Sequence, residues 1–168
     1  MSPPASQTNN EGMAAEKRAA GALPARILLV DDDPVNQMVA LGLLRRQGWH
    51  AVAAGNGKEA LQILATQSFN LILMDLQMPE MDGFQTATAI RLHEARSDAV
   101  SVPREISLAG HKPTDPRGRH IPIVALTTAS HPGMRERCLA AGMDDYLTKP
   151  ISPRALYATV EKHLGNTR

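Results

Sequence analysis

The sequence predicts an α/β domain in which five parallel strands and five helices form a doubly wound sheet. Short apolar runs alternate with helical stretches five times between residues 26 and 165. Continuous apolar runs are typical of strands that are buried on both faces of a parallel sheet, because helices then cover both faces. Right-handed crossover helices connect such strands.

The composition is that of a globular protein: 168 residues, with 18 Lys and Arg against 17 Asp and Glu. The formal charge of +1 gives no indication of nucleic-acid binding. A single cysteine, Cys138, excludes an intrachain disulfide and a cysteine-clustered zinc site. Neither a signal peptide nor an apolar run of about 18 residues is present, so we expect a cytoplasmic domain without a membrane segment.

The predicted domain begins after a segment, residues 1–25, that has no apolar periodicity and is expected to be a disordered tail or linker. Ile27–Val30 is the first strand. A helix follows, with Asp33 as N-cap and Pro34 as first residue, and Gly48 ends it. Its apolar face is expected to consist of Val35, Met38, Val39, Gly42 and Leu43.

The remaining strands and helices follow in the same alternation. The expected pairs are Trp49–Ala54 with Gly57–Ala65, Asn70–Met74 with Gly83–Ala95, Ile121–Leu126 with Pro132–Ala141, and Asp145–Thr148 with a helix opened by Ser152 and Pro153 and closed by Gly165. The domain therefore spans residues 26–165, followed by a short tail, residues 166–168. Residues 96–120 are long for a connection in such a fold, so we expect an inserted, solvated loop.

Polar residues follow the strands. They are Asp31, Asp32 and Asp33 after the first, Asp75 after the third, Thr127 and Thr128 after the fourth, and Lys149 after the fifth. In doubly wound sheets the ligand site lies outside the carboxyl ends of the strands. Clustered carboxylates repel one another and recruit a hard cation such as Mg²⁺. With a lysine and a hydroxyl opposite, they form the set that phosphoryl transfer onto an aspartate needs.

Four motifs stand in a fixed order along the chain: ILLVDDDPVNQ, LILMDLQMPEMDG, IPIVALTTAS and GMDDYLTKPIS. Together they resemble the response-regulator receiver domain of two-component signalling, a flavodoxin-like fold, over nearly everything but the tail. The stretches PVNQ and RERCLAAGMDDYLTKPIS are most similar to receivers of hybrid sensor histidine kinases.

The resemblance implies a reaction and a metal. Asp75 would be the phosphoacceptor, and a phosphohistidine of a sensor histidine kinase or histidine phosphotransfer protein would be the donor. Mg²⁺ would be held by Asp31, Asp32, Asp75 and the backbone carbonyl of Gln77. The domain would catalyse only its own phosphorylation and dephosphorylation, as a phosphorelay intermediate or as part of a hybrid histidine kinase.

The resemblance also implies a conformational switch. Thr127 and Lys149 would bind phosphoryl oxygens, and Lys149 would pair with Asp75 before transfer. The rotamer of Tyr146 would follow Thr127, and the Lys149–Pro150 bond would be cis. The readout face would be the fourth helix, the fifth strand and the fifth helix. Thr128 stands where receivers often have a smaller residue, so it is expected to narrow access to the site.

Other functions explain fewer residues. Residues 55–60 fit the dinucleotide-binding pattern G-x-G-x-x-[G/A], with Asp75 near the spacing of a ribose-binding acid, but that function leaves the other acids, Thr127 and Lys149 without a role. An aspartate-dependent phosphohydrolase needs an acid where Gln77 stands. A receiver that only docks on partners, without phosphorylation, stays open as an alternative.

Some candidate residues also have a structural interpretation. Asp33 is expected to be a helix cap, and Tyr146 could simply pack. The histidines show no metal-ligand spacing and are expected on the surface or in loops. They are His50, His93, His111, His120, His131 and His163.

Overall fold

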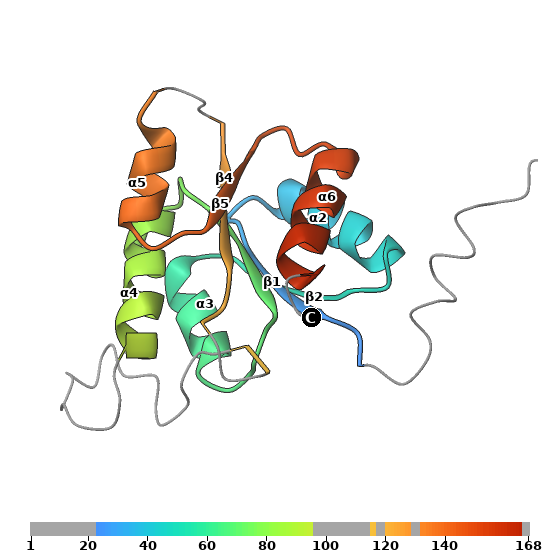
Figure 1. Cartoon of the computed structure of the whole chain (residues 1–168), viewed down its shortest axis with the longest axis horizontal. Coiled ribbons are helices and arrows are strands. Elements are labelled where there is room, and N and C mark those ends of the chain that lie inside the picture. Colours follow the sequence, from blue (N-terminus) through green and yellow to red (C-terminus); the bar gives the residue numbers. More distant parts are fainter. Residues whose placement is uncertain (1–22, 96–114, 117–119, 129–131, 166–168) are drawn as a thin grey trace, which may run out of the picture.

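A single parallel sheet in the order β2-β1-β3-β4-β5 forms the centre of the computed structural model (Figure 1). The structure describes residues 23–95, 115–116, 120–128 and 132–165. The strands are β1 (Arg26–Val30), β2 (His50–Ala54), β3 (Leu71–Asp75), β4 (Ile123–Thr127) and β5 (Asp145–Thr148). The chain winds from β1 outward to β2, then returns to β3 on the other side of β1 and continues to β5.

Helices cover both faces of the sheet, as the sequence predicts. They are α2 (Pro34–Arg46), α3 (Gly57–Leu64), α4 (Gly83–Ala95), α5 (Met134–Ala140) and α6 (Pro153–Gly165). In Figure 1, α2 and α6 lie on one side, and α3, α4 and α5 lie on the other. The two apolar cores follow the same division, so the predicted doubly wound fold of five strands and five helices is confirmed for the described residues.

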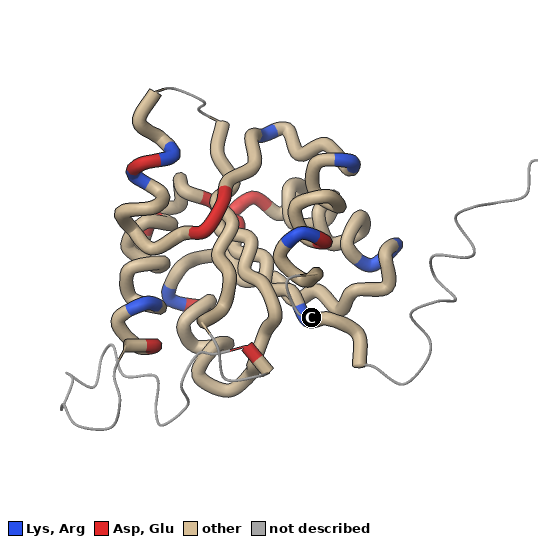
Figure 2. Tube along the Cα trace, viewed as in Figure 1, with Lys and Arg blue, Asp and Glu red and all other residues tan. Residues whose placement is uncertain are grey.

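Alternating side chains of the central strands fill the two cores. On β1, Leu28 and Val30 join the core under α3, α4 and α5, whereas Ile27 and Leu29 join the core under α2 and α6. All four side chains are buried. Lys, Arg, Asp and Glu occur only at the ends of the strands, and Figure 2 marks the charged residues along the chain in blue and red. Charged side chains that could bind a ligand or react therefore lie at the ends of the strands and not in the middle of the sheet.

The face that α2 presents to the sheet differs from the prediction. Asp33 caps the helix as expected, since its Oδ1 accepts the N–H of Val35 at 2.7 Å. The buried residues, however, are Ala40 and Leu44. Of the apolar face that the sequence predicted, Val35, Met38 and Val39 are 61%, 69% and 52% exposed, Gly42 is exposed, and only Leu43 packs against the core.

Strand boundaries shift by one or two residues from the expectation. β2 begins at His50 rather than Trp49, β3 includes Asp75 as its last residue, and β4 runs from Ile123 to Thr127. Most of the expected tail (1–25) and of the expected insertion (96–120), and all of residues 166–168, lie outside the described residues. None of the helices in the described ranges combines the length and apolar character that a membrane crossing requires.

Candidate functional site

Three carboxylates meet where β1 and β3 end side by side. Asp31 and Asp32 directly follow β1, and Asp75 is the last residue of β3. One oxygen from each lies within 4.8 Å of the others. Asp31 and Asp75 are buried, whereas Asp32 is exposed. Asp33, the helix cap, is outside this cluster, which agrees with its structural interpretation.

A half-buried lysine reaches these carboxylates from the end of β5. Lys149 Nζ lies 2.9 Å from Asp31 Oδ2 and 3.2 Å from Asp75 Oδ2. The expected pair with Asp75 is therefore present, and the shorter contact with Asp31 is an addition that the motifs did not indicate. The Lys149–Pro150 bond is cis, as expected. One cation thus bridges two of the three acids.

Burial and charge oppose each other in this cluster. Burial raises the pKa of Asp75, and the negative charge of Asp31 acts in the same direction. The N–H of Gln77, 3.1 Å from Asp75 Oδ1, and the Lys149 ammonium only partly offset this rise. Burial alone would lower the pKa of Lys149, but its contacts with Asp31 and Asp75 outweigh burial and raise it. Lys149 is therefore held in its charged form.

The other predicted site residues come from neighbouring strand ends. Thr127 is the last residue of β4, buried between β3 and β5, and its carbonyl accepts the Lys149 N–H at 2.7 Å. Thr128, the next residue, is exposed. Tyr146 lies on β5 opposite Ala125, two register positions before the pair of Thr127 and Thr148, and is 36% exposed.

Gly83 allows α4 to start against the backbone of Asp75. A Cβ at this position would lie 2.3 Å from the carbonyl oxygen of Asp75 and 2.9 Å from Leu76 Cα. Backbone atoms cannot move aside as a flexible side chain can, so only glycine fits here. This glycine therefore helps to position the Asp75 strand end.

The comparisons with known proteins agree with this geometry. The sequence profile of the response regulator receiver domain matches residues 27–106. The GacS sensor histidine kinase of Pseudomonas protegens is 39% identical over 140 residues, covering 83% of this chain and 13% of that protein. A receiver domain of a sensor histidine kinase from Pseudomonas aeruginosa, solved with magnesium in its active site cleft, is 33% identical with a TM-score of 0.65, and the match covers 85% of this chain and 99% of that one.

The chain belongs to the response regulator receiver domain family. A second solved relative is the receiver domain of Ssk1 from Saccharomyces cerevisiae, crystallised with the histidine phosphotransfer protein Ypd1. It is 28% identical with a TM-score of 0.66, covering 82% of this chain and 87% of that one. Probable histidine kinase 4 of Oryza sativa subsp. japonica is 37% identical over 145 residues, which are 85% of this chain. This receiver domain spans only 14% and 13% of the length of the two curated kinases.

The glycine-rich segment after β2 serves in this receiver as a helix cap. Asn56 Oδ1 accepts the N–H of Glu59 at 2.8 Å, and the Glu59 carboxylate accepts the N–H of Gly55 at 2.6 Å. This reciprocal arrangement satisfies two backbone donors at the start of α3. The local pattern that suggested dinucleotide binding is thus explained by helix capping.

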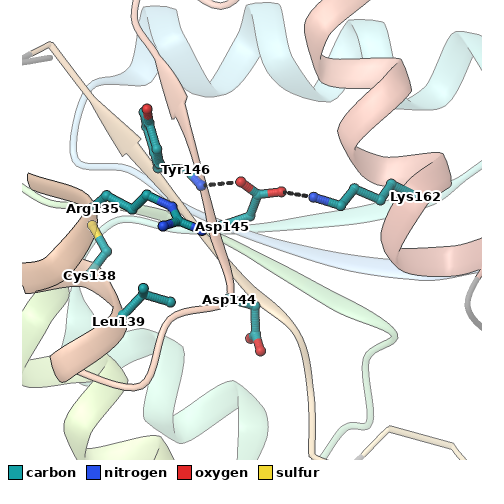
Figure 3. A pocket seen from close by; sticks show the side chains of 7 residues that line it. All are labelled: Arg135, Cys138, Leu139, Asp144, Asp145, Tyr146 and Lys162. Carbon is teal, nitrogen blue, oxygen red and sulfur yellow. Dashed lines mark hydrogen bonds and ion pairs between the residues drawn. The ribbon is translucent and has the colours of Figure 1, made fainter.

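The predicted readout face contains a pocket of about 80 Å³ (Figure 3). Its lining residues come from α5, α6 and the start of β5, and they are Arg135, Cys138, Leu139, Asp144, Asp145, Tyr146 and Lys162. Burial raises the pKa of the Cys138 thiol, so this cysteine stays protonated. Tyr146 lines this pocket and pairs with Ala125 of β4.

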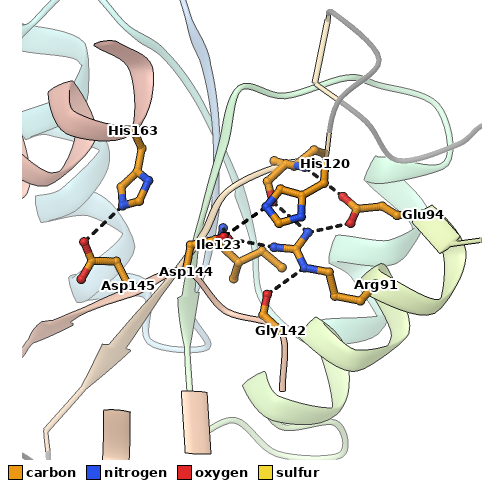
Figure 4. Close-up of polar contacts among 9 residues, drawn as sticks. Arg91, Glu94, His120, Ile123, Gly142, Asp144, Asp145 and His163 are labelled. Atoms are coloured by element: carbon orange, nitrogen blue, oxygen red, sulfur yellow. Dashed lines mark hydrogen bonds and ion pairs between the residues drawn. The ribbon is translucent and has the colours of Figure 1, made fainter. Parts of the chain in front are cut away.

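Sequence reasoning missed a polar network centred on Arg91 of α4 (Figure 4). Its guanidinium contacts Glu94 at 2.7 Å and Asp144 at 2.9 Å, and it donates to the carbonyls of Gly142 and Ile121. Glu94 also accepts the N–H of Ile121 at 2.9 Å. The network thereby joins α4 to the entry of β4 and to the loop before β5. No local motif predicts it, because its members are up to 53 residues apart.

Two of the histidines lie deeper than expected and on helices, since His93 on α4 and His163 on α6 are both only partly exposed. His163 lies on α6 with a side chain only 11% exposed, and its Nε2 is 3.2 Å from Asp145 Oδ2 (Figure 4). His120 is 53% exposed and contacts Asp144. His111 and His131 lie outside the described residues. His163 is drawn inward because an acid on β5 provides a partner for its ring.

Proposed function

We propose that this receiver domain takes a phosphoryl group from a phosphohistidine onto Asp75 in a Mg²⁺-dependent reaction. The donor would be a sensor histidine kinase or a histidine phosphotransfer protein, and the reaction would take place in the cytoplasm. The observation that carries the proposal is the acidic cluster of Asp31, Asp32 and Asp75, bridged by Lys149. Residues 26–165 would be the receiver, within a phosphorelay or a hybrid histidine kinase.

The donor set suits magnesium. Asp31, Asp32 and Asp75 offer three carboxylate oxygens within 4.8 Å, and hard cations such as Mg²⁺ prefer oxygen ligands. The backbone carbonyl of Gln77, two residues after Asp75, would add a fourth oxygen. When bound, Mg²⁺ supplies positive charge that neutralises the oxygens of the transferring phosphoryl group.

The residues of the chain itself would perform the transfer. An Asp75 carboxylate oxygen attacks phosphorus in line, the bond from phosphorus to the donor ring nitrogen breaks, and the nitrogen keeps the electron pair. The product is an acyl phosphate on Asp75 and a free histidine on the donor. Lys149, already 3.2 Å from Asp75, would hold one phosphoryl oxygen, and the Thr127 hydroxyl would hold another.

Phosphorylation would then change the balance of conformations. The phosphoryl group adds negative charge beside Lys149 and Thr127, and these groups would be drawn toward it. Tyr146 would follow Thr127 and alter the readout face of α5, β5 and α6. A shift from mostly inactive to mostly active needs about 5 kcal/mol of differential stabilisation.

Intact-protein mass spectrometry tests the proposal. The protein is incubated with acetyl phosphate, with Mg²⁺ or with a chelator, beside Asp75→Asn. We expect the unmodified sequence to gain one phosphoryl group only with Mg²⁺, and the variant to gain none. No gain from either acetyl phosphate or a phosphorylated histidine phosphotransfer protein, despite bound Mg²⁺, would contradict the proposal and favour a receiver that acts by docking alone.

A further inference from the structure

The three carboxylates of the acidic cluster are held unequally. Asp31 Oδ1 accepts the N–H of Asp33 at 2.9 Å, and its Oδ2 contacts Lys149. Asp75 is held by the N–H of Gln77 and by Lys149. The Asp32 carboxylate is exposed and makes no hydrogen bond or ion pair within the described part of the chain. Its direction therefore depends on the backbone that carries it.

A glutamine from α2 holds that backbone. Gln37 Nε2 donates a hydrogen bond of 2.6 Å to the main-chain oxygen of Asp31. This oxygen belongs to the peptide unit that joins Asp31 to Asp32, and a peptide unit is planar. A hydrogen bond to this oxygen restrains the orientation of the whole peptide unit, which includes Asp32 Cα. The directions in which the Asp32 side chain can point are restrained with it.

Gln37 is itself firmly placed. Its side chain is half-buried, and its backbone N–H bonds to the Asp33 carbonyl at 3.0 Å within the first turn of α2. The peptide unit on the other side of Asp31 is held independently, because the Asp31 N–H donates to the Ala54 carbonyl at 3.1 Å. The contact made by Gln37 is thus the one that restrains the peptide leading to Asp32.

We propose that Gln37 is a positioning residue for the magnesium site. It does not touch the metal in this arrangement. It restrains the peptide between Asp31 and Asp32, so that the otherwise unrestrained Asp32 carboxylate points into the acidic cluster before the cation arrives. Preorganised ligands bind more tightly because less ordering remains to be done on binding. The inference rests on the proposed magnesium site and adds a residue to it.

Gln37→Met tests the inference, because methionine has similar length but no donor. Mg²⁺ binding is measured by isothermal titration calorimetry on the full chain. A net contribution of about 1 kcal/mol per hydrogen bond corresponds to a roughly fivefold higher dissociation constant in the variant. We expect the Mg²⁺ concentration that half-saturates phosphorylation by acetyl phosphate to rise by the same factor, with an unchanged rate at saturating Mg²⁺.

Ala40→Gly is the matched control. Ala40 is buried on the same helix, and glycine there weakens the helix without removing a contact to Asp31. We expect a lower Tm with unchanged Mg²⁺ affinity. Equal affinity of Gln37→Met and the unmodified protein, or an equal loss in Ala40→Gly, would overturn the positioning role alone. Absence of Mg²⁺ binding by the unmodified protein would overturn the proposed site together with this inference.

Discussion

Gly83 shows how a single missing side chain shapes the site. An added Cβ would meet backbone atoms of Asp75 and Leu76 at 2.3 and 2.9 Å, so Gly83→Ala must displace the strand end that carries Asp75. We expect the free energy of unfolding to fall by about 1–3 kcal/mol. We also expect slower phosphorylation by acetyl phosphate at saturating Mg²⁺. Urea unfolding and a mass-spectrometric time course measure the two effects.

Gly42 provides the control for this substitution. It lies on the exposed side of α2, and a Cβ there meets nothing within 4 Å. Gly42→Ala should therefore raise the free energy of unfolding by about 0.5–1 kcal/mol, since alanine favours a helix interior. Unchanged stability and unchanged phosphorylation in Gly83→Ala would contradict the close approach of α4 to Asp75.

Asp145 links pH to the stability of the contact between β5 and α6. Burial alone would raise the pKa of Asp145, but bonds from Lys162, the Tyr146 N–H and His163 outweigh burial and lower it. A lowered folded-state pKa means that the carboxylate stabilises the fold above its ordinary pKa of about 3.9, and that this contribution is lost as pH falls through the lowered value.

Asp145→Asn tests this linkage. At pH 7 the variant should be less stable than the unmodified protein in urea unfolding, and the difference should shrink as pH falls below about 4. A difference that grows on acidification would show that Asp145 is not held as a carboxylate.

At the residue scale, the sequence predicted which side chains meet, but not all of their contacts. Asp31, Asp75 and Lys149 could be placed together because each stands at or directly after the carboxyl end of a parallel strand, and these ends lie on the same side of the sheet. The contact of Lys149 with Asp31 and the role of Arg91 depend on how helices and loops pack. No pattern of neighbouring residues encodes such long-range distances.

Helix α2 shows why a helical face can be assigned wrongly. Its sequence, PVNQMVALGLLRR, carries apolar residues around much of its circumference, so periodicity selects no single face. The larger residues Val35, Met38 and Val39 suggest a core face, yet Ala40 and Leu44 are the buried ones. Ala40 and Leu44 are four residues apart, so they lie on the same face of the helix on successive turns.

Paired substitutions in α2 test this assignment. Leu44→Ala should lower the free energy of unfolding by about 2–5 kcal/mol because it leaves a cavity. Met38→Ala should stay within about 0.5 kcal/mol of the unmodified protein, because its side chain is mostly in solvent. Denaturant unfolding measures both free energies. A larger loss of stability in Met38→Ala than in Leu44→Ala would contradict the orientation of α2.

The exposed apolar face of α2 also adjoins the acidic cluster, since the helix starts directly after Asp33. We therefore predict that the proposed phosphohistidine donor docks against this face when its histidine reaches Asp75. Met38→Asp should therefore slow transfer from a phosphorylated histidine phosphotransfer protein about tenfold, the effect of about 1.4 kcal/mol. Phosphorylation by acetyl phosphate should be unchanged, and equal slowing with both donors would contradict a docking role.

At the scale of the whole molecule, the end of α4 and the start of β4 lie far from the acidic cluster. In Figure 1, the end of α4 and the start of β4 lie at the edge of the sheet opposite the carboxyl ends of the strands. The Glu94 carboxylate and the Ile121 N–H, 2.9 Å apart, join the two sides of the attachment. This bond joins α4 to the start of β4 without residues 97–113.

Replacement of residues 97–113 by a short Gly/Ser linker tests this separation. Asp115 is kept because it is buried. We expect the unfolding free energy to change by no more than about 1 kcal/mol, since shortening a loop alters its closure entropy only slowly. Phosphorylation by acetyl phosphate should proceed at the same rate, and its loss would show that the replaced segment contributes to the site.

The architecture itself was the most predictable level of this protein. Buried parallel strands have to be apolar along their whole length, and their connections are helical, so the alternation along the chain determines the fold class. Strand boundaries moved by only one or two residues, as for β4, which begins at Ile123. These shifts left Asp31, Thr127 and Lys149 at the same edge of the sheet.

The central claim, that Asp75 is the phosphoacceptor, is tested most directly by locating the phosphoryl group. The protein is phosphorylated with acetyl phosphate and Mg²⁺ and treated with borohydride, which reduces an acyl phosphate to an alcohol, and peptide mass spectrometry then locates the reduced residue. We expect the modification at Asp75 alone, and none without Mg²⁺. Reduction at Asp31, Asp32 or another carboxylate instead would contradict the account.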